Sequence, residues 1–176
     1  MSETKTKCVF LDRDGVLNED CTNYMYDLKD LVIPEGVPEA LKTLKDAGFL
    51  LVVVTNQAGI AKGLYTADHV YTIHQAMQAA SGNALDDLYF SPYHPDNSGV
   101  SLSRKPGSLM LEKAIAKYDI DPSQSWMVGD RDRDMEAGKN VGVRTIHIVP
   151  ENEESFGDYA VVNLLEAAKI ILQNQN

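Results

Sequence analysis

Two aspartates separated by one residue, Asp12 and Asp14, stand directly after the short apolar run 8–11. Such a run predicts a buried strand, and ligands bind at the carboxyl ends of strands in open α/β sheets. Carboxylates in this position can bind a hard cation such as Mg²⁺, or one of them can form a covalent aspartyl-phosphate. The pattern Asp-x-Asp-Gly is also typical of a polar turn that ends a strand. This stretch alone leaves both interpretations open.

Three further polar groups follow predicted strands or lie in strand-to-helix loops. They are Thr55 with Asn56 after the apolar run 49–54, Lys105 in the loop 91–106, and Asp130 after the run 125–128. Taken singly, each group also fits an ordinary loop, as a capping threonine or a solvated cation would. In a doubly wound sheet the strand ends meet at one edge, where Asp12, Asp14 and Asp130 would hold one Mg²⁺. Thr55 and Lys105 would then bind phosphoryl oxygens, which is the arrangement that phosphoryl transfer needs.

The pattern of the whole chain predicts a sheet that can position these groups. Strands alternate with helices, and the strands are continuous apolar runs, as in parallel strands that are buried on both faces. We expect strands at 8–11, 49–54, 85–90, 125–128 and 145–149, a short edge strand at 160–162, and helices at 35–47, 66–80, 108–118, 135–140 and 164–172. The predicted fold is α/β, with a doubly wound, mainly parallel sheet (Rossmann-like) and helices on both faces.

The composition is that of a globular protein and limits the kinds of partner. The 176 residues are 44% hydrophobic and 24% charged, which predicts a single domain, residues 1–176, with a substantial core. The formal charge of −10 argues against a nucleic-acid surface, because such surfaces neutralise phosphates with Lys and Arg. We therefore expect a small-molecule substrate, no nucleic-acid partner and a monomeric protein.

The sequence also predicts where the protein works. No apolar run is long enough to cross a bilayer, and no signal-peptide core follows the polar N-terminus. Cys8 falls in a predicted core strand, so we expect no disulfide with Cys21 and a reducing compartment. These features predict a cytoplasmic protein without a membrane partner.

The four groups of polar residues resemble the motifs of the haloacid dehalogenase superfamily of phosphatases. Asp12-x-Asp14-Gly15 looks like the first motif, Thr55 the second, Lys105 the third and Gly129-Asp130-x-x-x-Asp134 the fourth. The resemblance covers about residues 7–149 and implies a Mg²⁺-dependent phosphatase that forms an aspartyl-phosphate.

The resemblance also implies a role for each motif residue. Asp12 would be the nucleophile, Asp14 the general acid and then the general base, and Thr55 and Lys105 would stabilise the phosphoryl group. The side chains of Asp12 and Asp130 and the backbone carbonyl of Asp14 would bind the metal. Asp134 would help to position Lys105 or a metal-bound water; the alternative is a carboxylate that merely stabilises a helix N-terminus.

Three longer stretches, 10–18, 54–63 and 104–107, are similar to one subgroup of this superfamily. It contains the D-glycero-D-manno-heptose 1,7-bisphosphate phosphatases and the related histidinol-phosphate phosphatases. The similarity implies removal of the C7 phosphate of the heptose and a chain without a large cap domain. It also implies a set of substrate-binding residues: Arg13, Asp20, Tyr24, Asn56, Gln57, Arg104 and Arg131. Histidinol phosphate or another small sugar phosphate is the alternative substrate.

One departure from the subgroup concerns a metal. Members usually hold a structural zinc with Cys-x-His and Cys-x-Cys in the loop before Arg-Lys-Pro. Here the corresponding residues are Ser91-Pro92-Tyr93 and Ser101-Leu102-Ser103, none of which is a good zinc ligand. We therefore expect no zinc and a loop held by its own packing and hydrogen bonds.

Two readings from other classes are a phospho-accepting receiver domain and a non-catalytic protein that binds a phosphorylated ligand. A receiver domain should place its acidic pair and its phospho-acceptor on different strands, whereas Asp12 and Asp14 follow the same one. A binding protein would have no need to retain Asp12, Asp14, Lys105 and Asp130 together. Both features favour the enzyme.

Overall fold

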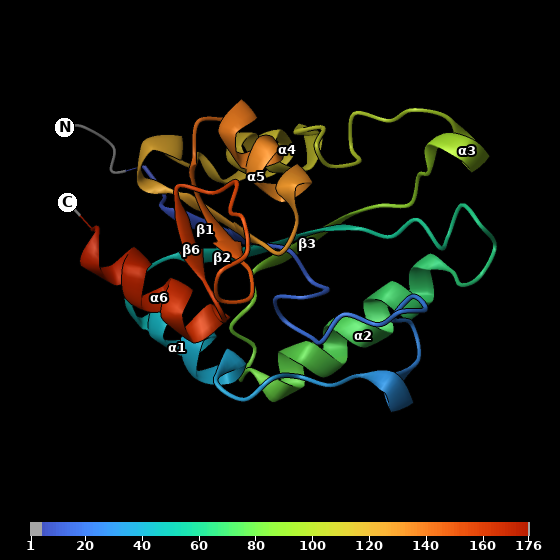
Figure 1. Ribbon diagram of the computed structural model, residues 1–176, viewed down its shortest axis with the longest axis horizontal. Coiled ribbons are helices and arrows are strands. Elements are labelled where there is room, and N and C mark those ends of the chain that lie inside the picture. Colours follow the sequence, from blue (N-terminus) through green and yellow to red (C-terminus); the bar gives the residue numbers. More distant parts are fainter. Residues whose placement is uncertain (1–4, 176) are drawn as a thin grey trace.

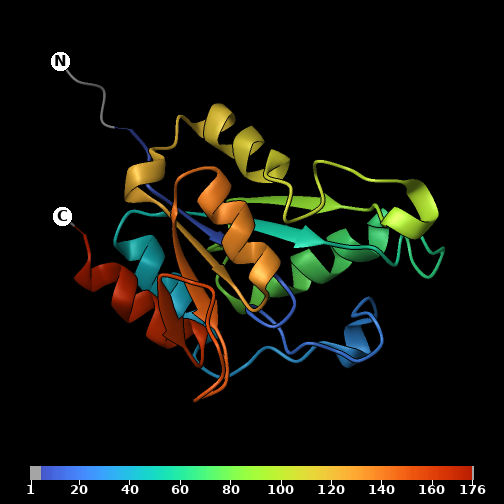
Figure 2. The same ribbon diagram turned by 45° about the horizontal axis from the view of Figure 1, so that its top comes forward.

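The computed structural model describes residues 5–175 as one six-stranded sheet between two layers of helices (Figures 1 and 2). The strand order is β3-β2-β1-β4-β5-β6, and every neighbouring pair is parallel. The strands are β1 (Cys8–Leu11), β2 (Leu50–Asn56), β3 (Asp87–Ser91), β4 (Trp126–Gly129), β5 (Arg144–Ile148) and β6 (Tyr159–Val161). The helices are α1 (Val37–Asp46), α2 (Ala67–Ala80), α3 (Pro95–Ser98), α4 (Leu109–Tyr118), α5 (Asp132–Asn140) and α6 (Leu164–Gln173), with 3-10 turns at Leu28–Asp30 and Pro122–Gln124. The predicted fold class is confirmed.

The central strands are buried because helices cover the sheet on both faces. Every residue of β1 and β4 is buried. Leu41 of α1, Ile73 of α2 and Ala167 of α6 belong to one core cluster, while Leu111 of α4 and Ala137 of α5 belong to a second. In Figure 1, α1, α2 and α6 accordingly lie below the sheet and α4 and α5 above it. The continuous apolar runs in the sequence reflect this two-sided burial.

The order of the strands determines where a site can form. From β1 the chain builds outward through β2 to β3, and then crosses to the other side of β1 to add β4, β5 and β6. The carboxyl ends of β1, β2 and β4 are therefore neighbours at the point where the winding reverses. Crevices at such a switch point are where open α/β sheets bind ligands.

Two element boundaries near this point differ from those expected. The strand expected at 49–54 extends to include Thr55 and Asn56, because β2 continues its pairing with Phe90 and Ser91 of β3. The helix expected at 135–140 begins at 132. There the backbone N–H of Arg131 donates to the Asp134 carboxylate at 3.1 Å and caps the first turn. Thr55, Asn56 and Asp134 therefore lie in regular structure, while Asp130 lies between β4 and α5.

The structure describes both cysteines and all of the helices within residues 5–175. Cys8 is buried in the core, where burial raises the pKa of its thiol, and Cys8 and Cys21 are both free. No helix within residues 5–175 is long and apolar enough to span a bilayer.

Candidate active site

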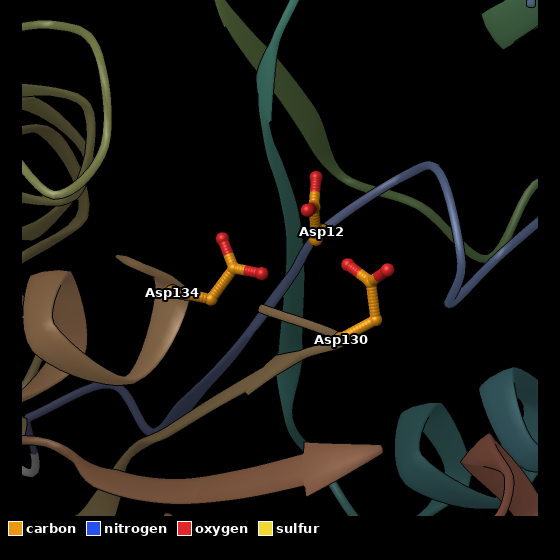
Figure 3. A group of neighbouring side chains, drawn as sticks. All are labelled: Asp12, Asp130 and Asp134. Carbon is orange, nitrogen blue, oxygen red and sulfur yellow. The ribbon is translucent and has the colours of Figure 1, made fainter. Parts of the chain in front are cut away.

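Three aspartates meet at the carboxyl edge of the sheet (Figure 3). Asp12 follows β1, Asp130 follows β4 and Asp134 lies in the first turn of α5. One oxygen of each carboxylate lies within 4.8 Å of the others. The backbone N–H of Asp12 donates to the Val128 carbonyl at 3.0 Å. This bond extends the β1–β4 pairing by one residue and fixes the position of the Asp12 backbone. Segments far apart in the sequence therefore deliver three carboxylates to one place.

Glycines make this approach possible. Gly15 has a φ of +80°, and a Cβ atom there would overlap the Asp130 carboxylate. At Gly129 a Cβ would overlap the Asp134 side chain. Each glycine thus permits a close approach that any other residue would block.

Lys105 supplies a buried positive charge next to the aspartates. Its Nζ lies 3.0 Å from Asp12 Oδ1 and 2.7 Å from Asp134 Oδ1, and it donates to the Val54 carbonyl at 2.7 Å. Burial alone would lower the pKa of this ammonium group, but the two carboxylates raise it above its usual value. Lys105 is therefore charged, and it partly balances Asp12 and Asp134.

Asn56 holds the backbone of Lys105 in place. Its side-chain amide donates to the Lys105 carbonyl and accepts from the Lys105 N–H, both at 3.0 Å. The amide of Asn56, expected to contact substrate, thus makes two hydrogen bonds that position the lysine.

The carboxylate of Asp14 has a different set of partners from that of Asp12. It accepts hydrogen bonds from Arg13 Nε at 3.0 Å, Arg13 Nη2 at 3.1 Å and Asn18 Nδ2 at 3.0 Å. The Asp14 side chain is not one of the three carboxylates that lie within 4.8 Å of one another; Asp134 is the third. The reason is that β1 ends at Leu11, so the alternation of an extended strand does not carry through to Asp14.

A buried glutamine links Asp14 to the second motif. Gln57 Nε2 donates to Asp14 Oδ2 at 3.1 Å and to Thr55 Oγ1 at 2.9 Å. Its Oε1 accepts from the Tyr65 hydroxyl at 2.6 Å and from Arg13 Nη2 at 3.2 Å. Gln57 and Arg13, both expected to contact substrate, are buried and direct these hydrogen bonds to neighbouring protein groups. They orient Asp14 and Thr55.

A cavity of about 250 Å³ opens over these groups. The cavity is lined by motif residues, by the loop 20–25 and by the start of α5. The lining residues are Asp12, Asp14, Asp20, Cys21, Thr22, Tyr24, Met25, Thr55, Asn56, Asp130, Arg131 and Arg133. Arg131 forms ion pairs with Asp20 at 2.6 Å and with Asp130 at 3.1 Å. The expected sugar-binding residues Asp20, Tyr24 and Arg131 therefore do border the same space as the aspartates. Arg104 is half-buried, and its Nη1 donates to the Tyr93 carbonyl at 3.2 Å.

The negative charges of the three aspartates are only partly balanced by Lys105, and this favours binding of a cation. Burial and the nearby Asp12 raise the pKa of Asp130 to about 6, and the same two causes raise the pKa of Asp134. A carboxyl group with a raised pKa is destabilised in its charged form, and a bound cation would relieve this. Oxygen ligands are those that Mg²⁺ prefers, so the cluster of Asp12, Asp130 and Asp134 fits a hard divalent cation.

The loop between β3 and α4 is closed by three serines. Ser103 Oγ lies 3.0 Å from Ser91 Oγ and 2.9 Å from Ser101 Oγ, both hydrogen-bonding distances. These serines stand at positions that correspond to zinc ligands in the subgroup that the sequence resembles. Hydroxyl hydrogen bonds join the two ends of the loop there.

Sequence reasoning missed two residues of this region. Tyr65 had no signal, because its contact with Gln57 depends on the path of the loop 57–65. Arg133 lies in the alternating stretch 130–134, whose acidic residues dominated the interpretation. The helical start at Asp132 is what brings Arg133 to the cavity.

Several known proteins are similar to this chain in sequence. A family model described as HAD-hydrolase-like matches residues 102–154. A relative from Haemophilus ducreyi, named D-glycero-beta-D-manno-heptose-1,7-bisphosphate 7-phosphatase, is 42% identical over 147 residues, covering 79% of this chain and 80% of its own. The protein of the same name from Haemophilus influenzae is 38% identical over 178 residues, covering 94% and 96%.

A solved structure gives the same picture in three dimensions. The crystal structure of D,D-heptose 1.7-bisphosphate phosphatase from B. bronchiseptica, complexed with magnesium and phosphate, matches with a TM-score of 0.84 at 27% identity. The match covers 96% of this chain and 99% of that one. Given this fold and the identity to its relatives, the chain is a phosphatase and belongs to the heptose-1,7-bisphosphate 7-phosphatase family of the haloacid dehalogenase superfamily.

Proposed function

We propose that this phosphatase removes the C7 phosphate of D-glycero-D-manno-heptose 1,7-bisphosphate in a Mg²⁺-dependent reaction. The observation that carries the proposal is the position of Asp12. Its carboxylate lies at the end of the central strand, paired with Lys105 at 3.0 Å, and borders a cavity that also contains arginines. The names of the relatives from both Haemophilus species support the choice of sugar.

In the proposed reaction an oxygen of the Asp12 carboxylate attacks phosphorus, and the bond from phosphorus to the sugar oxygen breaks. Asp14 donates a proton to the leaving oxygen, and then accepts one from the water that attacks the aspartyl-phosphate. Phosphate leaves and both carboxyl groups return to their starting states. The Asp14 side chain is 26% exposed, so a substrate in the cavity can reach it.

The remaining motif residues stabilise charge. Lys105 and the Thr55 hydroxyl bind oxygens of the phosphoryl group, while Asp134 and Asn56 hold Lys105 in position. The side chains of Asp12 and Asp130 and the backbone carbonyl of Asp14 would hold Mg²⁺, which neutralises the negative charge of the phosphate group when bound. The neighbouring structure complexed with magnesium and phosphate supports this assignment.

Asp130→Asn is expected to stabilise the metal-free protein at neutral pH. Because the pKa of Asp130 is raised in the fold, from its usual 3.8 to about 6, folding costs free energy once pH rises through that window. Allowing for solvent screening of this partly exposed group, the cost above pH 6 is about 2 kcal/mol. Without metal, the variant should therefore melt several degrees higher than the wild type at pH 7.5, with a smaller gap at pH 4. Thermal melts at both pH values measure this.

The same melts with added Mg²⁺ test the metal site. Mg²⁺ should raise the melting temperature of the wild type by mass action and have little effect on Asp130→Asn. An equal shift in both proteins would contradict a role for Asp130 as a metal ligand.

We further propose that the protein carries no structural zinc. The hydrogen bonds among Ser91, Ser101 and Ser103 support this, because hydroxyl groups are poor zinc ligands. Purified protein should contain far less than one zinc per chain after dialysis, and a chelator should leave its melting temperature in Mg²⁺-free buffer unchanged. Ser103→Ala should instead lower activity, since it releases both ends of the loop that precedes Lys105. Stoichiometric zinc that survives dialysis would refute the proposal.

The single sheet supports one domain, and the charge of −10 supports the absence of a nucleic-acid partner. The chain is one phosphatase domain, residues 1–176, that acts as a monomer in the cytoplasm. Its partner is a phosphorylated sugar, and it binds neither nucleic acid nor membranes. Light scattering of the purified protein tests the oligomeric state.

Initial rates of phosphate release test the substrate. The panel is the two anomers of heptose 1,7-bisphosphate, fructose 1,6-bisphosphate and histidinol phosphate, each with and without Mg²⁺. We expect the highest kcat/KM with a heptose bisphosphate and loss of turnover on chelation. A higher kcat/KM with histidinol phosphate would overturn the proposed substrate.

A further inference from the structure

Arg133 is a cation of the active-site cavity to which nothing above assigns a role. It lies in the first turn of α5 and lines the same cavity as Asp12, Asp14 and Thr55. Its Nε is buried and has no hydrogen-bond partner among the described residues. A buried donor without an acceptor is costly, and an acceptor from a molecule bound in the cavity would remove that cost.

Two other arginines near the active site do have carboxylate partners. Arg13 is paired with Asp14, and Arg131 is paired with Asp20 and Asp130. Within residues 5–175, neither Arg133 nor Arg104 makes an ion pair with a carboxylate, although the chain has 26 acidic residues. Two guanidinium groups thus remain unneutralised beside an otherwise acidic site.

Among the described residues, Arg104 carries a second unpaired positive charge, and its Nη1 donates to the Tyr93 carbonyl at 3.2 Å. Burial and the neighbouring Arg133 charge lower the pKa of Arg104. Holding two like charges near each other is unfavourable unless an anion lies between them. Arginine forks match phosphate oxygens in a bidentate way, so a phosphate is an anion that the Arg133 guanidinium fits.

The inference deepens the proposed function and depends on it, because a bisphosphate brings a second phosphate that is not hydrolysed. The reacting phosphate is accounted for by Asp12, Thr55 and Lys105. We infer that Arg133 binds the second phosphate and thereby determines the preference for bisphosphates over monophosphates.

Arg133→Gln tests this inference, with Arg133→Lys as the variant that retains the charge. Losing one charge-assisted hydrogen bond should raise KM for heptose 1,7-bisphosphate by about 10- to 100-fold and change kcat by less than about 3-fold. The ratio of kcat/KM for the bisphosphate to kcat/KM for p-nitrophenyl phosphate should fall accordingly, because the latter has one phosphate. Arg133→Lys should recover part of the ratio. The matched control is Lys113→Gln, which removes one charge from an exposed position of α4 and should leave the ratio unchanged.

Two outcomes would overturn the inference. One is a ratio in Arg133→Gln equal to that of the wild type, and the other is an equal loss on both substrates, which a distorted site would give. The proposed function fails separately, if the wild type does not hydrolyse heptose bisphosphate. In that case fructose 1,6-bisphosphate and fructose 6-phosphate are titrated into Asp12→Asn protein with and without Arg133→Gln. Weaker binding of the bisphosphate alone would then still support the role of Arg133, and unchanged binding would refute it.

Discussion

Asp12→Asn is expected to reduce phosphate release by roughly 10⁴-fold or more, because the amide cannot form the aspartyl-phosphate. The substitution keeps the size of the side chain and removes one of three crowded carboxylates. Asp12 is the neighbour that most strongly raises the pKa values of Asp130 and Asp134 after burial itself. The variant should therefore stay folded, with a metal-free melting temperature equal to or above that of the wild type.

Three measurements distinguish lost chemistry from lost structure. Initial rates with heptose bisphosphate give the activity, thermal melts give the stability, and titration with substrate gives the affinity. Asp96→Asn, at an exposed position of α3, is the matched control and should keep full activity. Retention of more than a hundredth of the activity by Asp12→Asn would contradict the role of Asp12 as nucleophile.

Lys105→Met is expected to lose both stability and activity. Lys105 is fully buried between Asp12 and Asp134, so its removal leaves two buried carboxylates without their positive partner. Breaking a buried ion pair in this way costs about 3–5 kcal/mol, which should lower the melting temperature by roughly 10 °C. Phosphate release should fall by at least about 10³-fold, since the variant cannot stabilise the phosphoryl oxygens.

Two companion variants make this prediction sharper. Lys117→Met removes a lysine paired with Asp87 at the surface, where solvent screens the charges, and should shift the melting temperature by less than about 2 °C. The double variant Lys105→Met/Asp134→Asn restores part of the charge balance and should recover stability without recovering activity. A stable Lys105→Met protein would contradict the buried ion pairs, and an active one would contradict the catalytic role.

The fold was largely predictable, because each buried strand leaves a recognisable pattern in its own short stretch of sequence. Parallel strands that are covered on both faces are continuous apolar runs, and each expected strand was found within about two residues of its place. Boundaries were less predictable where pairing continued into polar sequence. Thr55 and Asn56 look like loop residues, yet β3 supplies backbone partners for them.

The site was predictable to the extent that it depends on strand ends. Asp12, Asp130 and Lys105 lie together as their positions after strands or in a strand-to-helix loop indicated. The hydrogen-bond partners of Asp14 and Gln57 could not be predicted, because they depend on the turn after β1 and on the path of the loop 57–65. Contacts of this kind depend on side-chain directions in irregular backbone, which have no period in the sequence.

Asn56 and the serines have a consequence for how such an enzyme can change. The backbone of Lys105 is held from β2, and the stretch 92–100 between the joined serines is mostly solvent-exposed. Evolution, or a designer, can therefore exchange that stretch as a module while Lys105 keeps its alignment with the aspartates.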